Sequence, residues 1–315
     1  MGTQIIRGLH NIHPNHRGCV VTIGNFDGMH VGHQTILARL KENAKRLMAP
    51  SCVITFEPQP REFFAKDQLN VPRLMRWSEK YYALSQLNID YLLVIQFNKQ
   101  FSILSSIDFI KEILVNQLAI KSILVGDDFR FGKGREGDFH FLKKSGEIFD
   151  FEVEDTQSIF LNNERVSSTA IRKALINGNH HLAEQLLSHP YTMMGKVVHG
   201  DKVGRELGFP TANIFLHRSV SPLQGIYVVR MHGLSNKGLP GVANVGMRPT
   251  VNGTRMLLEV YLLNFNENIY GKRVCVEFCK KLRDEERYPT LDLLKIQIAK
   301  DVEAAKDFFT ESGEL

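Results

Sequence analysis

The sequence predicts two domains of different class: an α/β domain built on a parallel sheet, followed by an all-β barrel that ends in a helix. In the first half, short apolar stretches alternate with helical ones, an order typical of parallel strands joined by crossover helices. In the second half, strand-like stretches are separated by Gly, Pro and Asn, and we expect no helix before the C-terminal one. At 315 residues the chain has room for two domains, which we place at 1–187 and 188–315.

The expected strands of the first half are short and rich in β-branched residues: Cys19–Ile23, Cys52–Phe56, Tyr91–Ile95 and Ser122–Val125. Apolar side chains at helical spacing predict helices near 36–47, 78–87 and 107–118. In a parallel sheet, ligands bind beyond the carboxyl ends of the strands. Polar and Gly-rich stretches follow three of the expected strands at that edge: Gly24–His33, Glu57–Arg61 and Gly126–Gly137.

In the second half, the stretches expected to form the barrel are short and separated by turn residues: Thr192–Val198, Ile214–Leu216, Gly225–Met231, Leu257–Leu263 and Arg273–Lys280. After Pro289, apolar side chains return at helical spacing from Leu291 to Val302. This pattern predicts a closing amphipathic helix.

Composition limits the class of protein. With 43% hydrophobic and 23% charged residues and no long apolar run, the chain is expected to be globular, without a membrane span or a signal peptide, and therefore cytoplasmic. The four cysteines lack CxxC spacing, which favours buried free thiols over a zinc site or a disulfide framework. The net charge of +5 suits polyphosphate binding, and it would also suit weak nucleic-acid binding.

The stretch Gly24–His33 predicts a phosphate-binding site. A helix that begins after a strand presents free N–H groups and a positive dipole end, and here its start carries His30 and His33, with three glycines that allow close approach of a ligand. Imidazole N–H groups could stabilise the charge that develops on an α-phosphate under attack. Two alternatives stay open from the spacing alone: a metal site that lacks an evident third ligand, and ordinary surface histidines.

A second Gly-rich stretch, Gly132–Gly137, fits the GxGxxG dinucleotide fingerprint and follows an expected strand. We expect no clear amphipathic helix after it, and its flank is highly charged. Both features argue against a Rossmann NAD site, although a phosphate-contacting loop stays open.

The second half contains a candidate metal and base site. Thr211 and Asn213 carry oxygen ligands suited to Mg²⁺, and their spacing puts them on one face of an extended segment that Pro210 stiffens. The alternative is a polar turn that leads into a strand. Glu259 interrupts an apolar strand, where a buried carboxylate is costly. It is either paired with Arg248 or Arg255, or it is a general base.

These motifs resemble known families. Gly24–His33 is similar to the GxFDxxHxGH signature of the nucleotidyltransferase superfamily, and Ser167–Arg172 is similar to its SSTxIR-type partner loop. The resemblance implies a Rossmann-like nucleotidyltransferase in which His30, His33 and Arg172 act on ATP phosphates. The other ATP contacts that it implies are Gly24, Phe26, Asp27, Gly28, Gly32, Ser167, Ser168 and Thr169.

A narrower resemblance covers almost the whole chain. Arg7–Leu9, Phe56–Pro60 and Gly126–Gly132 resemble the bacterial bifunctional riboflavin kinase/FMN adenylyltransferases. Five segments resemble their kinase module: Gly208–Asn213, Gly225–Tyr227, Asn244–Gly246, Leu258–Phe265 and Tyr270–Lys272. Asn264 departs from the usual acidic residue. The flavin contacts that this resemblance implies are Pro58, Asp128, Phe129, Arg130 and Phe131. The Mg·ATP contacts that it implies are Gly208, Pro210, Thr211 and Asn213.

By this resemblance, Glu259 activates the riboflavin 5′-hydroxyl. The barrel phosphorylates riboflavin with ATP and Mg²⁺ to give FMN, and the N-terminal domain uses a second ATP to convert FMN into FAD. We expect no nucleic-acid or membrane partner, and the sequence does not decide the oligomeric state. Two alternatives are a nucleotidyltransferase with an inert barrel, and a barrel that binds nucleic acid. The second would require interleaved aromatic and basic residues on one face.

Overall fold

A computed structural model describes residues 2–65, 71–200, 203–218, 220–250 and 253–313. The chain forms two compact units. The residues up to Val71 join Lys80–Ser167 in the first unit, and Pro72–Glu79 joins the residues from Ser168 onward in the second. The domain boundary at 187 stays a prediction. None of the helices in the described part of the chain is long and apolar enough to cross a membrane.

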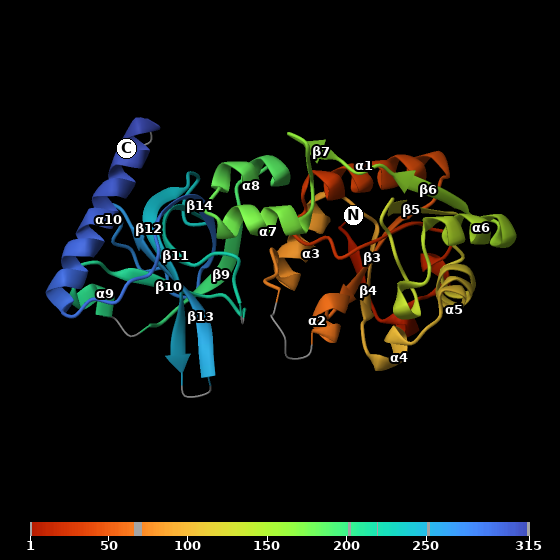
Figure 1. Ribbon diagram of the computed structural model, residues 1–315, viewed down its shortest axis with the longest axis horizontal. Coiled ribbons are helices and arrows are strands. Elements are labelled where there is room, and N and C mark those ends of the chain that lie inside the picture. The colour runs from red at the N-terminus through yellow and green to blue at the C-terminus, as the bar shows by residue number, and fades with distance from the viewer. Residues whose placement is uncertain (1, 66–70, 201–202, 219, 251–252, 314–315) are drawn as a thin grey trace. The chain divides into compact units, whose positions relative to one another are not determined.

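The first unit is built on a six-stranded sheet in the order β1-β4-β3-β2-β5-β6, and all its neighbouring strands are parallel (Figure 1). The strands are β1 (Gln4–Arg7), β2 (Val20–Ile23), β3 (Ser51–Glu57), β4 (Tyr91–Gln96), β5 (Ser122–Gly126) and β6 (Glu152–Thr156). The α/β prediction is confirmed. The four expected strands are the central ones, whereas β1 and β6 had not been expected, because one has only four residues and the other is acidic and half-buried.

Helices connect these strands: α1 (Val31–Arg46), α2 (Pro60–Phe64), α3 (Trp77–Gln86), α4 (Lys99–Ser102), α5 (Ser106–Asp108), which continues into η3 (Phe109–Gln117), and α6 (Phe139–Phe149). Short 3-10 turns lie at Leu9–Asn11 (η1), Pro14–His16 (η2) and Lys133–Arg135 (η4), and Phe160–Leu161 (β7) pairs with Glu164–Arg165 (β8). The three expected helices are confirmed.

The expectation that no clear helix follows Gly132–Gly137 is wrong, because α6 begins at Phe139. Its N-cap is Asp138, whose carboxylate accepts a hydrogen bond from the Phe141 N–H at 2.9 Å. Such a cap satisfies one of the free N–H groups at a helix start. Leu142 is fully buried on its inner side.

The strand order positions the site of the first unit. Strand β2 lies between β3 and β5. From β2 the chain continues through β3 to β4 on one side, and it then crosses to β5 and β6 on the other side of β2. The order therefore reverses between β2 and β5. Ligands of open α/β sheets bind at such a reversal, beyond the carboxyl ends of the strands.

The second unit contains a closed barrel of antiparallel strands in the order β10-β13-β12-β11-β14-β9. The strands are β9 (Thr192–Val198), β10 (Thr211–Phe215), β11 (Gly225–His232), β12 (Leu239–Thr250), β13 (Gly253–Leu262) and β14 (Arg273–Arg283). The barrel prediction is confirmed. Strand β12 had not been expected, because two prolines and two glycines interrupt its apolar pattern.

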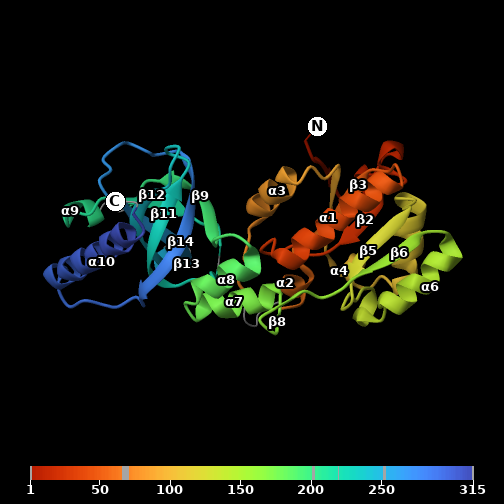
Figure 2. The same ribbon diagram turned by 90° about the horizontal axis from the view of Figure 1, so that it is seen from above.

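In the part of the chain that the structure describes, four helices accompany the barrel: α7 (Ser168–Ile176), α8 (His180–Leu187), α9 (Val203–Glu206) and α10 (Leu291–Glu311). The closing helix is thus confirmed, whereas the four-residue α9 corrects the expectation that no helix precedes it. Helix α10 packs against β11 and β12 (Figure 2). The apolar side chains at this contact are Ile226, Val228, Val242, Leu263, Val302, Ala305 and Phe309.

All four cysteines are free thiols. Cys19 and Cys52 are fully buried as expected, whereas Cys275 and Cys279 are half-buried. The difference follows from the alternation of β14, in which the residues between these positions, such as Val276 and Phe278, point into the barrel.

Candidate functional site

In the first unit, the loop between β2 and α1 brings the Gly24–His33 residues to the carboxyl edge of the sheet. Its backbone is tightly turned, with positive φ angles at Phe26 (47°), Gly28 (94°) and Met29 (46°). Only glycine tolerates the Gly28 conformation readily. Phe26 and Asp27 are buried, so the loop has a defined shape at the start of α1.

The two histidines pack against each other at this helix start. His30 is the N-cap of α1, and its Nδ1 accepts a hydrogen bond from the His33 N–H at 3.3 Å. The imidazole rings are stacked, with centroids 3.5 Å apart, and Phe26 lies beside His33 at 5.1 Å. Burial, followed by the nearby charges of His30 and Lys80, holds the pKa of His33 well below 6.5. His33 is therefore neutral at pH 7.

A neutral imidazole at a helix N-terminus can donate a hydrogen bond to a phosphate oxygen without bringing a net charge. The Nδ1 atom of His33 is buried and has no hydrogen-bond partner among the residues that the structure describes. The described residues hold no group of three His, Cys, Asp or Glu side chains that could bind an ion.

The predicted flavin contacts follow β3 and β5 at the same edge. Pro58 is exposed at the end of β3. After β5, Phe131 is only 8% exposed and belongs to the core, while Phe129 stacks on it with centroids 5.3 Å apart. The exposed Arg130 donates to the Phe129 carbonyl at 3.0 Å.

Arg165, which no sequence motif marked, pairs with the predicted Asp128. The guanidinium of Arg165 lies 2.9 Å from Asp128 and 3.3 Å from Asp127, and Asp127 also accepts from Ser158. Arg165 lies in the β8 strand of a hairpin. No motif marked it, because its link to Asp128 spans more than thirty residues and depends on the fold.

The partner loop Ser167–Arg172 is divided between the units. Ser167 belongs to the first unit, whereas Ser168, Thr169 and Arg172 belong to the second. In the second unit, the Arg172 Nε atom donates to the Pro72 carbonyl at 2.6 Å. The association of this loop with the two histidines stays a prediction.

In the second unit, a cavity of about 250 Å³ lies between the outer face of the barrel and α10. Its lining combines apolar side chains of the barrel and α10 with polar ones from both. The apolar side chains include Leu207, Phe209, Ile226, Val242, Tyr261, Leu294, Ile298 and Val302. The polar ones include Thr211, Asn244, Glu259, Arg283, Glu285, Glu286 and Asp301. An apolar pocket with a few convergent polar groups is typical of small-molecule sites.

Strand register brings Asn213, which is not itself a lining residue, beside the polar residues Thr211, Glu259 and Asn244 of this cavity. Asn213 of β10 lies directly opposite Glu259 of β13, and Glu259 lies directly opposite Asn244 of β12. Residues directly opposite on antiparallel strands share a face, with Cβ atoms roughly 5 Å apart. Thr211 is two residues before Asn213, on that same face. The Oδ1 atoms of Asn213 and Asn244 are buried and lack hydrogen-bond partners among the described residues.

The environment of Glu259 differs from the expectation of a carboxylate buried in an apolar strand. Leu258 and Val260 are fully buried inside the barrel, but Glu259 points to the other face and is half-buried in the cavity wall. The period-two alternation of a strand explains the difference. The side chains of Arg248 and Arg255, which were considered as its partners, lie outside the described residues. Gly208 and Pro210 flank Phe209 in the loop that enters β10.

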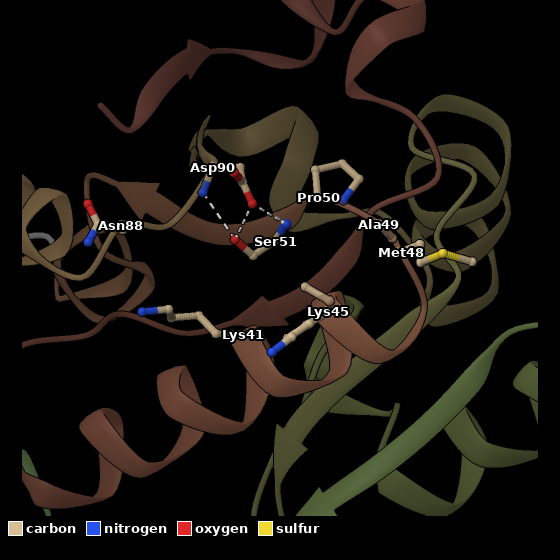
Figure 3. Close-up of a pocket in the computed structure, with 9 residues that line it drawn as sticks. Lys41, Lys45, Met48, Ala49, Pro50, Ser51, Asn88 and Asp90 are labelled. Carbon is tan, nitrogen blue, oxygen red and sulfur yellow. Dashed lines mark hydrogen bonds between the residues drawn. The ribbon is translucent and has the colours of Figure 1, made fainter. Parts of the chain in front are cut away.

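A larger, shallow pocket of about 430 Å³ lies at the opposite edge of the first unit's sheet, where β3 and β4 begin (Figure 3). Asp90 accepts hydrogen bonds from the Ser51 N–H at 2.8 Å and from the Ser51 hydroxyl at 2.7 Å. These groups satisfy each other and join the starts of the two strands, while Lys41 and Lys45 line the open side. The pocket is remote from the carboxyl edge, where ligands of such sheets bind.

Comparisons with known proteins match both halves of the chain. The family model described as FAD synthetase matches residues 12–170, and the one described as riboflavin kinase matches residues 187–309. A bifunctional riboflavin kinase/FMN adenylyltransferase of Haemophilus influenzae is 50% identical over 97% of this chain and 99% of its own. One from Escherichia coli is 48% identical over 97% and 98%. A crystal structure described as a macrolide-efflux protein from Streptococcus pneumoniae is 30% identical, with a TM-score of 0.80 over 96% of this chain and 98% of its own.

Proposed function

The chain belongs to the family of bifunctional riboflavin kinase/FMN adenylyltransferases, and we propose how its residues divide the two reactions between the two units. The protein phosphorylates riboflavin with ATP to give FMN, and it adenylylates FMN with ATP to give FAD. We place the phosphorylation in the barrel cavity and the adenylyl transfer at the carboxyl edge of the parallel sheet.

One observation carries the kinase assignment: the strand register sets Glu259 beside Asn213, on the face of the barrel that also carries Thr211. Glu259 is a carboxylate at the wall of a cavity large enough to hold part of a small molecule. It would accept the proton of the riboflavin 5′-hydroxyl while that oxygen attacks the γ-phosphate of ATP. A positioned general base of this kind contributes roughly 10²–10⁴-fold to the rate.

Mg²⁺ fits the residues of β10. The Asn213 Oδ1 atom is a buried acceptor without a partner among the described residues, and Thr211 adds a hydroxyl on the same face. Both are hard oxygen ligands, which Mg²⁺ prefers. When bound with ATP, the ion would offset phosphate charge in the transition state. Gly208 and Pro210 would shape the loop that meets the nucleotide.

In the first unit, the neutral His33 and the helix-capping His30 would contact the phosphates of ATP at the start of α1. A donor held at that place stabilises the negative charge that grows on the α-phosphate when the FMN phosphate attacks it. Ser167–Arg172 would contact the same triphosphate. Pro58 and Asp128–Phe131 would contact the flavin, and Arg165 would hold Asp128 in place.

The test separates the two reactions in one protein. Purified chain is incubated with ATP and Mg²⁺, plus either riboflavin or FMN, and the flavins are separated by chromatography. Glu259→Gln is expected to lower FMN formation at least about 100-fold while FMN is still converted into FAD. His33→Ala is expected to do the reverse. Glu267→Gln and His140→Ala are matched controls on exposed side chains.

Normal FMN formation by Glu259→Gln would refute its role as the base. Loss of both reactions in either variant would show instead that the fold is damaged. If the unaltered protein made FAD from FMN but never made FMN from riboflavin, the barrel would be inert, as the one-site alternative predicts.

A further inference from the structure

The row of polar residues on the outer face of the barrel extends beyond the residues assigned so far. Asn213, Glu259 and Asn244 lie side by side on β10, β13 and β12, with Glu259 in the middle. The next residue across, Ile226 of β11, is apolar and lines the same cavity. With the roles proposed above, the row would have a metal side on β10, a base in the centre and a second amide on β12.

The amide of Asn244 requires an explanation of its own. Its Oδ1 atom is buried and has no hydrogen-bond partner among the described residues, although the side chain lines the cavity. Buried acceptors are almost always satisfied in folded proteins. Adjacent strands lie roughly 4.8 Å apart, so Asn244 is about two strand spacings from Asn213. Because Glu259 stands between them, an ion bound by Thr211 and Asn213 leaves the Asn244 oxygen for a different donor.

The groups beside Asn244 indicate which kind of hydrogen-bond donor its Oδ1 atom would accept from. Two residues along β12, a Cβ at Gly246 would lie 2.0 Å from the Glu285 Oε1 atom, so this glycine allows the carboxylate to lie over the strand next to Asn244. Glu285 and Glu286 line the cavity with Asn244. Arg283 lines this side as well, but its guanidinium is paired with Asp301. The remaining groups are acceptor oxygens and carboxylates, which disfavour a phosphate and suit the hydroxyl groups of a polyol.

We propose that the Asn244 Oδ1 atom accepts a hydrogen bond from a hydroxyl group of the ribityl chain of riboflavin, and so holds the 5′-hydroxyl against Glu259. The inference rests on the proposed kinase site. The γ-phosphate lies on the β10 side of the base, so the rest of the alcohol extends to the β12 side. There the apolar Ile226 and Val242 follow the amide and offer a surface for the flavin ring.

The experiment compares two flavins that share a ring. Riboflavin carries the ribityl chain, whereas lumiflavin has a methyl group in its place. Binding of each to the full-length protein is measured by fluorescence with ADP and Mg²⁺ present. Asn244→Ala is expected to weaken riboflavin binding about 3–10-fold, the equivalent of one neutral hydrogen bond, and to leave lumiflavin binding unchanged. The KM for riboflavin should rise, while the KM for ATP stays the same.

Controls separate the possible failures. Asn236→Ala, an exposed asparagine in the turn before β12, should change neither flavin. In each preparation, conversion of FMN into FAD reports that the first unit is intact, and thermal unfolding reports on the barrel. Equal losses for riboflavin and lumiflavin would overturn the proposal in favour of a structural role. A raised Mg²⁺ requirement, as expected for Asn213→Ala, would overturn it in favour of a metal ligand.

An unchanged affinity for riboflavin in Asn244→Ala would also refute the proposal, without affecting the assignment of Glu259. Failure of the proposed kinase site would give a different result, namely normal FMN formation by Glu259→Gln.

Discussion

Replacing Glu79 with Gln is expected to destabilise the second unit by about 3–5 kcal/mol. Glu79 and Arg218 are 4% and 3% exposed, and their closest charged atoms are 2.6 Å apart. Removing one partner of a buried ion pair leaves the other charge uncompensated, which costs about that much. The loss is larger than that of a surface pair, because such pairs contribute roughly 0–1 kcal/mol.

The hydrogen bonds around the pair support the upper part of this range. One carboxylate oxygen of Glu79 accepts from the Met194 N–H at 2.8 Å, and the other accepts from the Arg76 N–H at 2.6 Å and from Arg218. Glutamine keeps only one acceptor oxygen, so at least one of these contacts is lost together with the charge. Arg218 also donates to the carbonyls of Arg73 and Leu74.

Urea unfolding followed by fluorescence measures the effect directly. The chain has a single tryptophan, Trp77, and it lies in the same segment as Glu79. Glu303→Gln, which breaks the exposed pair with Lys306, is the control and should change the unfolding free energy by less than about 1 kcal/mol. A loss below about 1 kcal/mol for Glu79→Gln would refute the argument, as would an equal loss in both variants.

Three further predictions concern single side chains. Burial, with a contribution from Lys281, lowers the pKa of His180 to about 4. Its neutral form therefore stabilises the fold above pH 6.5, and this contribution of up to about 3 kcal/mol is lost as the pH falls toward 4. His180→Phe should flatten the change in melting temperature between pH 7 and pH 5. Gly246→Ala should raise the KM for riboflavin several-fold, because the new methyl group displaces Glu285, and an unchanged KM would contradict this. The lowered pKa of His33 predicts no titration of its ring near pH 6.5 by NMR in the free protein.

Sequence patterns predicted the parts of the fold that depend on local spacing. Apolar strands such as β3 and β9 were found within one or two residues, because buried strands and turns have distinctive local composition. Strand β12 was missed because Pro240 and Pro249 interrupt it, although Pro240 is in register with β11 and Pro249 with β13. Tertiary pairing overrides local preference there.

For the candidate sites too, the sequence predicted residues that belong to local motifs, but not those that only the fold brings together. Glu259, Thr211 and Asn213 stood out from their motifs, but the position of Asn244 beside the base depends on strand register, which the sequence does not display. Arg165 was missed for the same reason, since only the fold brings it to Asp128. The ion pair of Glu79 and Arg218 joins residues 139 positions apart, so no local pattern could reveal it.

The path of the backbone has a consequence for taking this enzyme apart. The chain passes between the compact units at 71–72, again at 79–80 and finally at 167–168, so a single cleavage cannot release either one whole. A recombinant fragment that starts at the barrel would lack the eight-residue piece inserted from upstream, and Arg218 would lose its carboxylate. Adding that octapeptide in trans should then rescue the fragment, much as a missing strand complements a pilin subunit.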